Sequence, residues 1–121
     1  MGSYEHLTAW QVAHRLVMAT YRCTATWPTT ERYALASQAR RAAFSIAVNV
    51  AEGSAKRGPR EFRRFLDISL GSLAELQYIL KLAHDLGYLT SEAFTELEHL
   101  RAQTGRLVWG LYRSLRERAM P

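Results

Sequence analysis

Apolar residues along this chain recur at spacings of three and four and never settle into strict alternation, which is the pattern of amphipathic helices and not of strands. Short breaks separate four such segments. We expect helices over residues 7–26, 31–51 and 58–86, and a fourth from residue 90 or 91 to about 118. The pattern therefore predicts an all-α fold.

The first two helices end at residues that disfavour helical backbone. Trp27-Pro28 should end the first helix, because the residue before a proline is pushed out of the α region. Thr29 or Thr30 can then cap the second helix with its hydroxyl. Gly53 is suited to the left-handed conformation that closes many helices, so we expect the second helix to end there.

The third and fourth helices are bounded in a similar way. Gly58-Pro59 should open the third helix, since proline is favoured at the first helical position, and Gly87 should close it. Thr90 or Ser91 can cap the fourth helix. Every connection is short, so consecutive helices should be antiparallel. We expect residues 1–121 to form one domain, an antiparallel up-down-up-down four-helix bundle.

The third helix has two apolar stripes. The first is Phe62, Phe65, Ser69, Ser72, Leu76, Ile79, Ala83 and Leu86, and the second is Leu66, Leu70, Leu73 and Leu80. Because a surface helix usually buries an arc of only about 100° or a little more, the second stripe favours a further packing partner and thus an oligomer. Trp109 and Tyr112 also lie off the seam of the fourth helix. The alternative is that the third helix is simply the most buried of the four.

The second helix has one polar stripe among its alanines. If the second and third helices turn near Lys56, this stripe should face two polar residues of the third helix and form a polar network with them. An Arg41–Glu75 ion pair would then be partly buried and satisfied, as buried charges require. The alternative is a solvated helix face. The expected network consists of Gln38, Arg41, Ser45, Asn49, Glu52, Ser72 and Glu75.

Composition adds limits on the cellular setting. With 121 residues, 48% of them hydrophobic, the chain has room for one packed core. Cys23 is the only cysteine, which excludes an intrachain disulfide and a cysteine-based zinc site and fits a reducing compartment. No apolar run approaches the roughly 18 to 20 residues of a membrane span. We therefore expect a cytoplasmic protein without membrane contact.

The net charge of +5 is unevenly distributed. Two basic segments, residues 56–64 and 101–118, flank a stretch in which six acidic residues stand against Lys81 alone. In the expected bundle both basic segments reach one end, and the opposite end collects Glu31, Asp85, Glu92, Glu96 and Glu98. A phosphate at the start of the third helix would relieve the crowding of arginines there. The candidate nucleic-acid-binding residues are Lys56, Arg57, Arg60, Arg63, Arg64, Arg113 and Arg116.

The basic residues have two alternative roles, either as a solvated basic end or as one side of a contact in which basic and acidic ends meet between subunits.

The catalytic and metal-binding motifs that the sequence resembles are incomplete. Gly53 and Gly58 have P-loop spacing but lack the Lys and Ser or Thr that should follow, and the single Glu96-x-x-His99 pair is too little for a di-iron site. We expect no enzyme activity, no metal site and no cofactor. Gly71-Ser72 suggests a small-residue packing notch.

Several motifs resemble a known family. They are Trp10, Trp27-Pro28, Glu31-Arg-Tyr33, Gln38-Ala-Arg-Arg41, Ser45-Ile46-Ala-Val-Asn49-Val-Ala-Glu52-Gly53 and Ser72-Leu-Ala-Glu75-Leu. The chain resembles the four-helix bundle proteins encoded in intervening sequences of bacterial large-subunit rRNA. This resemblance implies a cytosolic homopentamer around a central channel. The family is also similar to the accessory variability determinant protein of diversity-generating retroelements, which binds nucleic acid and the reverse transcriptase through a basic surface.

Three functional hypotheses follow. In the first, a non-catalytic oligomer, expected to be a homopentamer, is an accessory protein that binds RNA or DNA through its basic end. In the second, the oligomer is a scaffold that binds another protein and no nucleic acid. The third is a cryptic metal- or ligand-binding bundle.

Overall fold

The computed structural model describes residues 3–119, so the first two and last two residues of the predicted domain lie outside the described residues. Four helices account for most of this range: α1 Thr8–Thr24, α2 Leu35–Ser54, α3 Gly58–Asp85 and α4 Ser91–Ala119. Short 3-10 turns at Tyr4–His6 and Thr29–Glu31 precede α1 and α2. No strand occurs between residues 3 and 119. The predicted all-α fold with four helices is confirmed.

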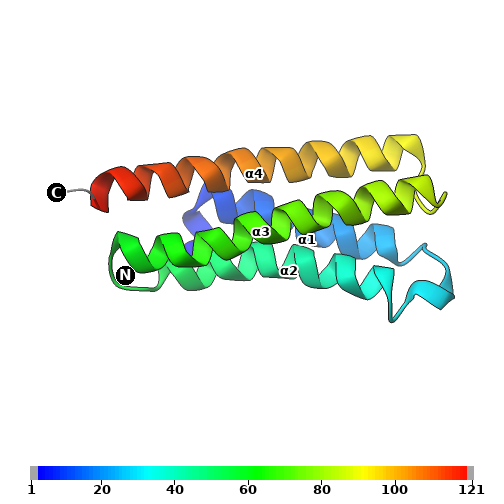
Figure 1. Ribbon diagram of the computed structural model, residues 1–121, viewed down its shortest axis with the longest axis horizontal. Coiled ribbons are helices and arrows are strands. Elements are labelled where there is room, and N and C mark those ends of the chain that lie inside the picture. The colour runs from blue at the N-terminus through cyan, green and yellow to red at the C-terminus, as the bar shows by residue number, and fades with distance from the viewer. Residues whose placement is uncertain (1–2, 120–121) are drawn as a thin grey trace.

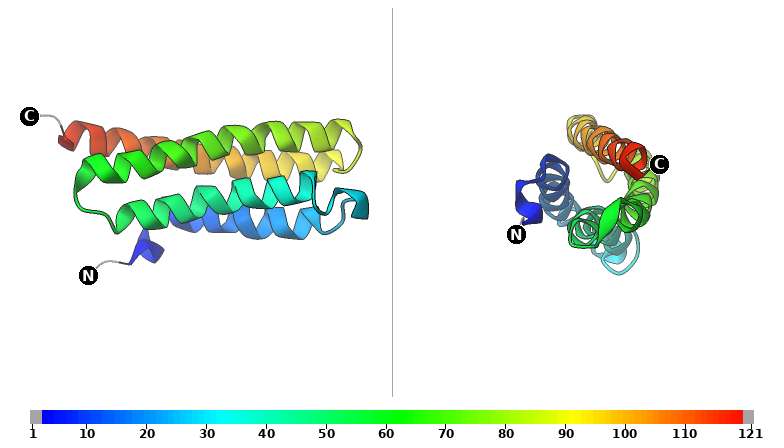
Figure 2. Two further views of the ribbon diagram at one scale, coloured as in Figure 1. Left: turned by 60° about the horizontal axis from the view of Figure 1, so that its bottom comes forward. Right: turned by 90° about the vertical axis from the view of Figure 1, so that its left-hand side faces the viewer.

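The helices lie side by side with their axes along the length of the molecule (Figure 1). Their ribbons surround a common centre when the bundle is viewed from one end, and α1 begins short of the end at which α3 begins (Figure 2). α1 packs against α2 and α4, and α3 packs against the same two helices. No described helix has the length and hydropathy required to cross a membrane.

The core is largely aliphatic; its buried threonine hydroxyls are hydrogen-bonded, whereas the buried Trp27 Nε1 has no partner among the described residues. Its largest fully buried apolar side chains are Leu16, Ile46, Leu66, Leu76, Leu80, Val12, Val50 and Val108. The buried hydroxyls of Thr20 and Thr104 donate to the carbonyls of Leu16 and Leu100, at 2.7 and 2.8 Å. These bonds to carbonyls four residues earlier leave neither hydroxyl unpaired, as burial requires.

Small residues form the face of α2 that meets α3. Alanines and Gly53 lie on the buried side of α2, and Gly53 is inside the helix, which continues to Ser54. A Cβ at Gly53 would lie 2.9 Å from both Phe62 Cδ1 and Phe65 Cβ. The predicted left-handed cap at Gly53 is therefore wrong. A glycine is needed here because the start of α3 comes too close for any side chain.

The expectation that α3 carries more apolar surface than one bundle can bury is also wrong. Most of both stripes is buried within this single chain, including Leu66, Leu73 and Leu80 of the second stripe. The reason is that α3 packs against α2 on one side and α4 on the other, which widens its buried arc. Leu86 remains 51% exposed. The α3 stripes therefore give no argument for an oligomer.

The connection between α1 and α2 differs from the prediction. Neither Thr29 nor Thr30 caps α2, because residues 29–31 form the 3-10 turn and α2 starts only at Leu35. Glu31 takes the capping role instead, its Oε1 accepting a hydrogen bond from the Leu35 amide at 3.3 Å. Its Oε2 accepts from the Tyr88 hydroxyl at 2.8 Å, which joins this connection to the one between α3 and α4.

The ends of α3 and the start of α4 follow the prediction. Gly58 has φ +79° and Pro59 occupies the first turn of α3. Gly87 has φ +82°, the left-handed backbone that glycine adopts without strain. The Thr90 hydroxyl accepts a hydrogen bond from the Ala93 amide at 3.1 Å and so caps α4.

Gly53→Ala should lower the free energy of unfolding. The new methyl group clashes with Phe65 near the backbone, at a cost of about 1–3 kcal/mol that exceeds the roughly 1 kcal/mol gained in helix propensity. Urea unfolding followed by circular dichroism measures the loss. Gly105→Ala is the matched control, since a Cβ there meets only Leu73 Cδ1 at 4.0 Å. The free energy of unfolding of Gly105→Ala should rise by about 0.5–1 kcal/mol. Equal changes in the two variants would contradict a steric requirement for glycine at position 53.

Removing either partner of the Glu31–Tyr88 bond should lower the thermal midpoint. The bond raises the pKa of Tyr88 above its ordinary value, with burial as a smaller cause. The stabilisation should be complete below about pH 10 and disappear as pH rises through the raised pKa, because the unfolded chain then loses the proton first. Thermal melts of wild type, Tyr88→Phe, Glu31→Gln and the double variant test this. Additive losses in the double variant, or a difference unchanged above pH 10, count against the bond.

Candidate functional site

The two basic segments meet at one end of the bundle. α3 begins and α4 ends at the same side in Figure 1, as the short connections predict. We call this end the basic pole and define it by the seven candidate binding residues. Six of their side chains are exposed, and Arg63 is partly buried. The residues of the pole are Lys56, Arg57, Arg60, Arg63, Arg64, Arg113 and Arg116.

The start of α3 presents backbone donors at this pole. Arg57 is the N-cap residue, with extended backbone, and its side chain makes no capping hydrogen bond. The first amides of a helix have no partner within the helix, and the helix dipole favours an anion beside them. Because Lys56 and Arg57 precede this turn and its one acid, Glu61, is paired with Arg64, the electrostatics of the pole suit an incoming phosphate or carboxylate.

A hollow of about 610 Å³ lies between the first turns of α3 and the last turns of α4. Arg64 binds Glu61 through two hydrogen bonds of 3.2 Å, and this contact holds the pKa of Glu61 below its usual range. Arg63 Nε is buried and has no hydrogen-bond partner among the described residues. The hollow is lined by Arg60, Glu61, Arg63, Arg64, Asp67 and Tyr112.

Aromatic rings accompany the arginines, a feature that the sequence interpretation missed. Arg64 and Lys56 lie over the Phe65 ring, at 4.9 and 5.3 Å from its centroid. Trp109 and Tyr112 stack on each other with ring centroids 5.5 Å apart. Their spacing of three residues, with arginines four and seven residues after Trp109, is the signal available in the sequence. From the sequence alone, the spacing of Trp109 and Tyr112 indicates only a contact between subunits.

The polar stripe of α2 does meet α3. The Ser72 hydroxyl donates to Ser45 Oγ at 2.7 Å, and Asn49 Nδ2 donates to the same oxygen at 3.2 Å. A hollow of about 320 Å³ above this contact is lined by Gln38, Arg41, Ala42, Phe44, Ser45, Ser72 and Glu75. The polar stripe of α2 therefore meets α3 as expected, through Ser45, Asn49 and Ser72.

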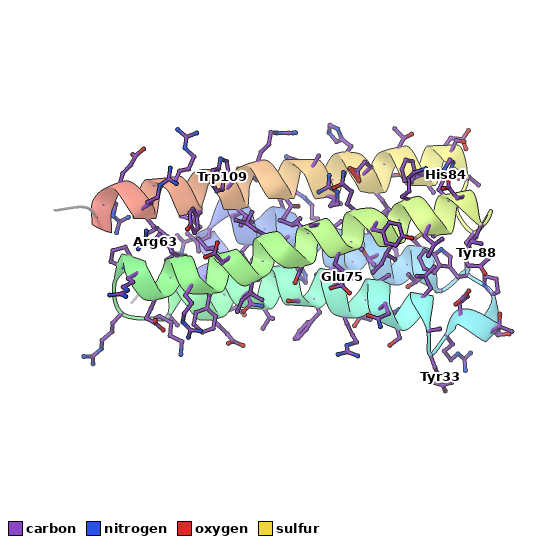
Figure 3. All side chains as sticks on the ribbon, in the orientation of Figure 1. Tyr33, Arg63, Glu75, His84, Tyr88 and Trp109 are labelled. Carbon is purple, nitrogen blue, oxygen red and sulfur yellow. The ribbon has the colours of Figure 1, made fainter. Side chains whose placement is uncertain are left out.

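The charged members of the predicted network do not join it. Arg41 and Glu75 are both exposed, and neither forms an ion pair in the described part of the chain. Figure 3 shows Glu75 along the boundary between α3 and α2. The predicted Arg41–Glu75 pair is wrong because both charged groups reach water and need no buried partner. Glu52 is exposed as well and forms no ion pair among the described residues.

The opposite end of the molecule is acidic, and two of its five carboxylates, those of Asp85 and Glu98, have a cationic partner. Asp85 accepts from Lys81 at 3.0 Å, and Glu98 from Arg101 at 2.6 Å. Glu31 is bound to Tyr88. At the basic pole, only Arg64 has a carboxylate partner within residues 3–119. The separation of charge along the bundle therefore persists after local pairing. Among the described residues, no group of three His, Cys, Asp or Glu could hold a metal ion.

Comparison with known proteins gives a family and a similar fold. The family model described as "23S rRNA-intervening sequence protein" matches residues 5–110. A comparison with the curated proteins finds no match. A crystal structure of a protein of unknown function from the S23 ribosomal protein family of Bacteroides thetaiotaomicron has a TM-score of 0.80 with this chain, at 17% identity. The alignment covers 87% of this chain and 95% of that one.

The family match covers the polar stripe and the start of α3, but it ends before the last turns of α4. Arg113 and Arg116 therefore lie outside the matched range, whereas the α3 half of the basic pole lies inside it. At 17% identity, the Bacteroides protein supports the fold only. Because the family model spans well over half of the 121 residues, the chain belongs to the 23S rRNA-intervening sequence protein family.

Proposed function

We propose that this protein is a non-catalytic accessory protein that binds RNA or DNA through the basic pole. The observation that carries the proposal is the meeting of the two basic segments at one end, where only one of seven cationic groups has a carboxylate partner in the described chain. Phosphate contacts by Lys and Arg dominate the affinity of proteins for nucleic acids. The uncapped start of α3 adds backbone donors to the same surface.

We also propose that the up-down-up-down bundle acts as a cytoplasmic homopentamer. The support is the family resemblance, together with large apolar side chains left exposed on neighbouring helices. Phe44 on α2 is 56% exposed, and Tyr78 on α3 is 66% exposed. In a ring of parallel bundles the basic poles would share one face, and an extended polyanion would then bind several poles at once.

Binding to RNA or DNA should fall steeply with salt concentration. With four to seven phosphate contacts, affinity for a single strand should drop about 50-fold or more between 50 and 200 mM salt. Fluorescence polarisation of labelled 20-nucleotide RNA and DNA over a salt series measures this. The quadruple variant Arg57→Gln, Arg60→Gln, Arg113→Gln, Arg116→Gln should flatten the log–log slope by about 3.

The matched control removes the same number of charges elsewhere. Arg15, Arg22, Arg32 and Arg41 are exposed, lie outside the basic pole and form no ion pair in residues 3–119. Their quadruple Gln variant should retain most of the salt slope. Equal slopes in the two variants would mean that net charge alone attracts the strand. Absent or salt-independent binding favours the protein scaffold instead.

Native mass spectrometry should report an assembly of about 69 kDa, five times the 13.8 kDa chain. Replacement of Phe44 and Tyr78 by Ser should shift the population toward smaller species, because burial of these exposed rings would be a main source of contact energy between subunits. Met18→Ser, an equally apolar exposed site on α1, serves as the control. A monomeric wild type, or a mass other than five copies, contradicts the pentamer.

A further inference from the structure

The last turns of α4 carry an exposed aromatic pair. Trp109 is 44% exposed and stacks on Tyr112 with only 10° between the ring planes. Tyr112 is partly buried and lines the hollow that also contains Arg60, Arg63 and Arg64. The pair therefore extends from an open face of α4 to the arginine-lined hollow. Figure 3 shows Trp109 and Arg63 in the same half of the bundle, far from Tyr33.

Arginines alternate with these rings along α4. Arg106 precedes Trp109 by three residues, and Arg113 and Arg116 follow it by four and seven, so all share one helix face. All three are exposed. The Arg116 guanidinium lies 5.9 Å from the centroid of the Trp109 ring. The indole of Trp109 is thus partly exposed on a basic helix face, and one of the cations lies over its ring.

This arrangement distinguishes between forms of nucleic acid. Duplexes hide the faces of their bases within the stack and present mainly phosphates to an exposed helix. A single strand offers unpaired bases, which stack on aromatic side chains while neighbouring cations follow the backbone. Arginines alone would bind the phosphates of single strands and duplexes alike. An exposed tryptophan among them adds affinity only where an unpaired base can stack on it.

Two carboxylates restrict where the strand can run. Glu61 and Asp67 line the hollow on the α3 side, and Glu61 already occupies Arg64. These carboxylates offset part of the positive charge of Arg60, Arg63 and Arg64 on that wall, so the arginines of α4 attract phosphates more strongly. Building on the proposed nucleic-acid function, we propose that Trp109 stacks on an unpaired base of single-stranded RNA or DNA whose phosphates contact Arg106, Arg113 and Arg116.

The test compares single strands with duplexes. Labelled 20-nucleotide oligo(U), oligo(dT) and 20-base-pair RNA and DNA duplexes are titrated at 50 mM salt, with polarisation as the readout. Trp109→Ala should weaken binding of both single strands about 5- to 100-fold and change duplex binding less than 2-fold, as expected for the loss of one stacked base. Tyr33→Ala, which removes an 88% exposed ring at the other end, should change neither.

A conservative variant separates stacking from folding. Trp109→Phe keeps a ring and should retain most of the single-strand affinity. Addition of oligo(U) should quench tryptophan emission in the wild type, because a stacked base quenches the Trp109 indole. It should not do so in Trp109→Phe, whose two remaining tryptophans, Trp10 and Trp27, are outside the proposed contact. This fluorescence comparison stands even if the alanine variant fails to fold.

Several results would overturn the inference. Equal losses on single strands and duplexes, or unchanged binding of Trp109→Ala, would exclude stacking while leaving the basic pole as a binding surface. A reduced native mass for Trp109→Ala would make the indole a contact between copies of the chain. If the wild type binds none of the four probes, the proposed nucleic-acid function itself fails. A loss of affinity in Trp109→Ala on oligo(U), on oligo(dT) or on both supports the inference, and the strand with the larger loss is the preferred one.

Discussion

The close approach of α2 and α3 is the constraint on which the rest of the structure depends. Alanines make up most of the buried face of α2, and at Gly53 no side chain separates the helices, so Phe62 and Phe65 of α3 come close to the α2 backbone there. Small residues at a helix contact permit this, and the dense packing of protein interiors leaves little tolerance for change. The position of α3 then determines two further features: the hydrogen bond between Ser72 of α3 and Ser45 of α2, and the hollow between α3 and α4.

The same constraint determines where the charges lie. Since α2 ends beside the start of α3, the intervening residues cannot extend away from the bundle, and the first arginines of α3 are held opposite the end of α4. Aromatic rings support these cations: the Phe65 ring lies beneath both Lys56 and Arg64, and the Trp109 ring lies near Arg116. The basic pole is thus a packed surface in which several cationic side chains have restricted positions, which lowers the entropy lost when an anion binds.

Sequence periodicity is sufficient for the number and approximate bounds of the helices, because apolar spacing and turn residues such as Pro59 and Gly87 act locally. It fails where the deciding contact is distant in sequence. Gly53 resembles a helix end, yet its role is set by Phe62 and Phe65 across the interface. The local pattern favours a threonine cap for α2, although Glu31 fills that role and is positioned by Tyr88, 57 residues later. Arg41 and Glu75 do line the same hollow between α2 and α3, but both side chains are exposed to water and form no buried pair. For the candidate site, the cations of the basic pole can be identified from the sequence, whereas the rings among them cannot.

One further property follows from unequal helix lengths. α1 has 17 residues, whereas α3 and α4 have 28 and 29, so at the basic pole the long helices extend past α1 (Figure 2). The other end is closed by the Glu31–Tyr88 bond between its two connections, whereas the basic pole has a single connection, between α2 and α3. The free energy of local opening should therefore be graded along the bundle, lowest at the pole. Amide hydrogens there would exchange first with solvent, and a bound polyanion would slow that exchange most at the helix ends it contacts.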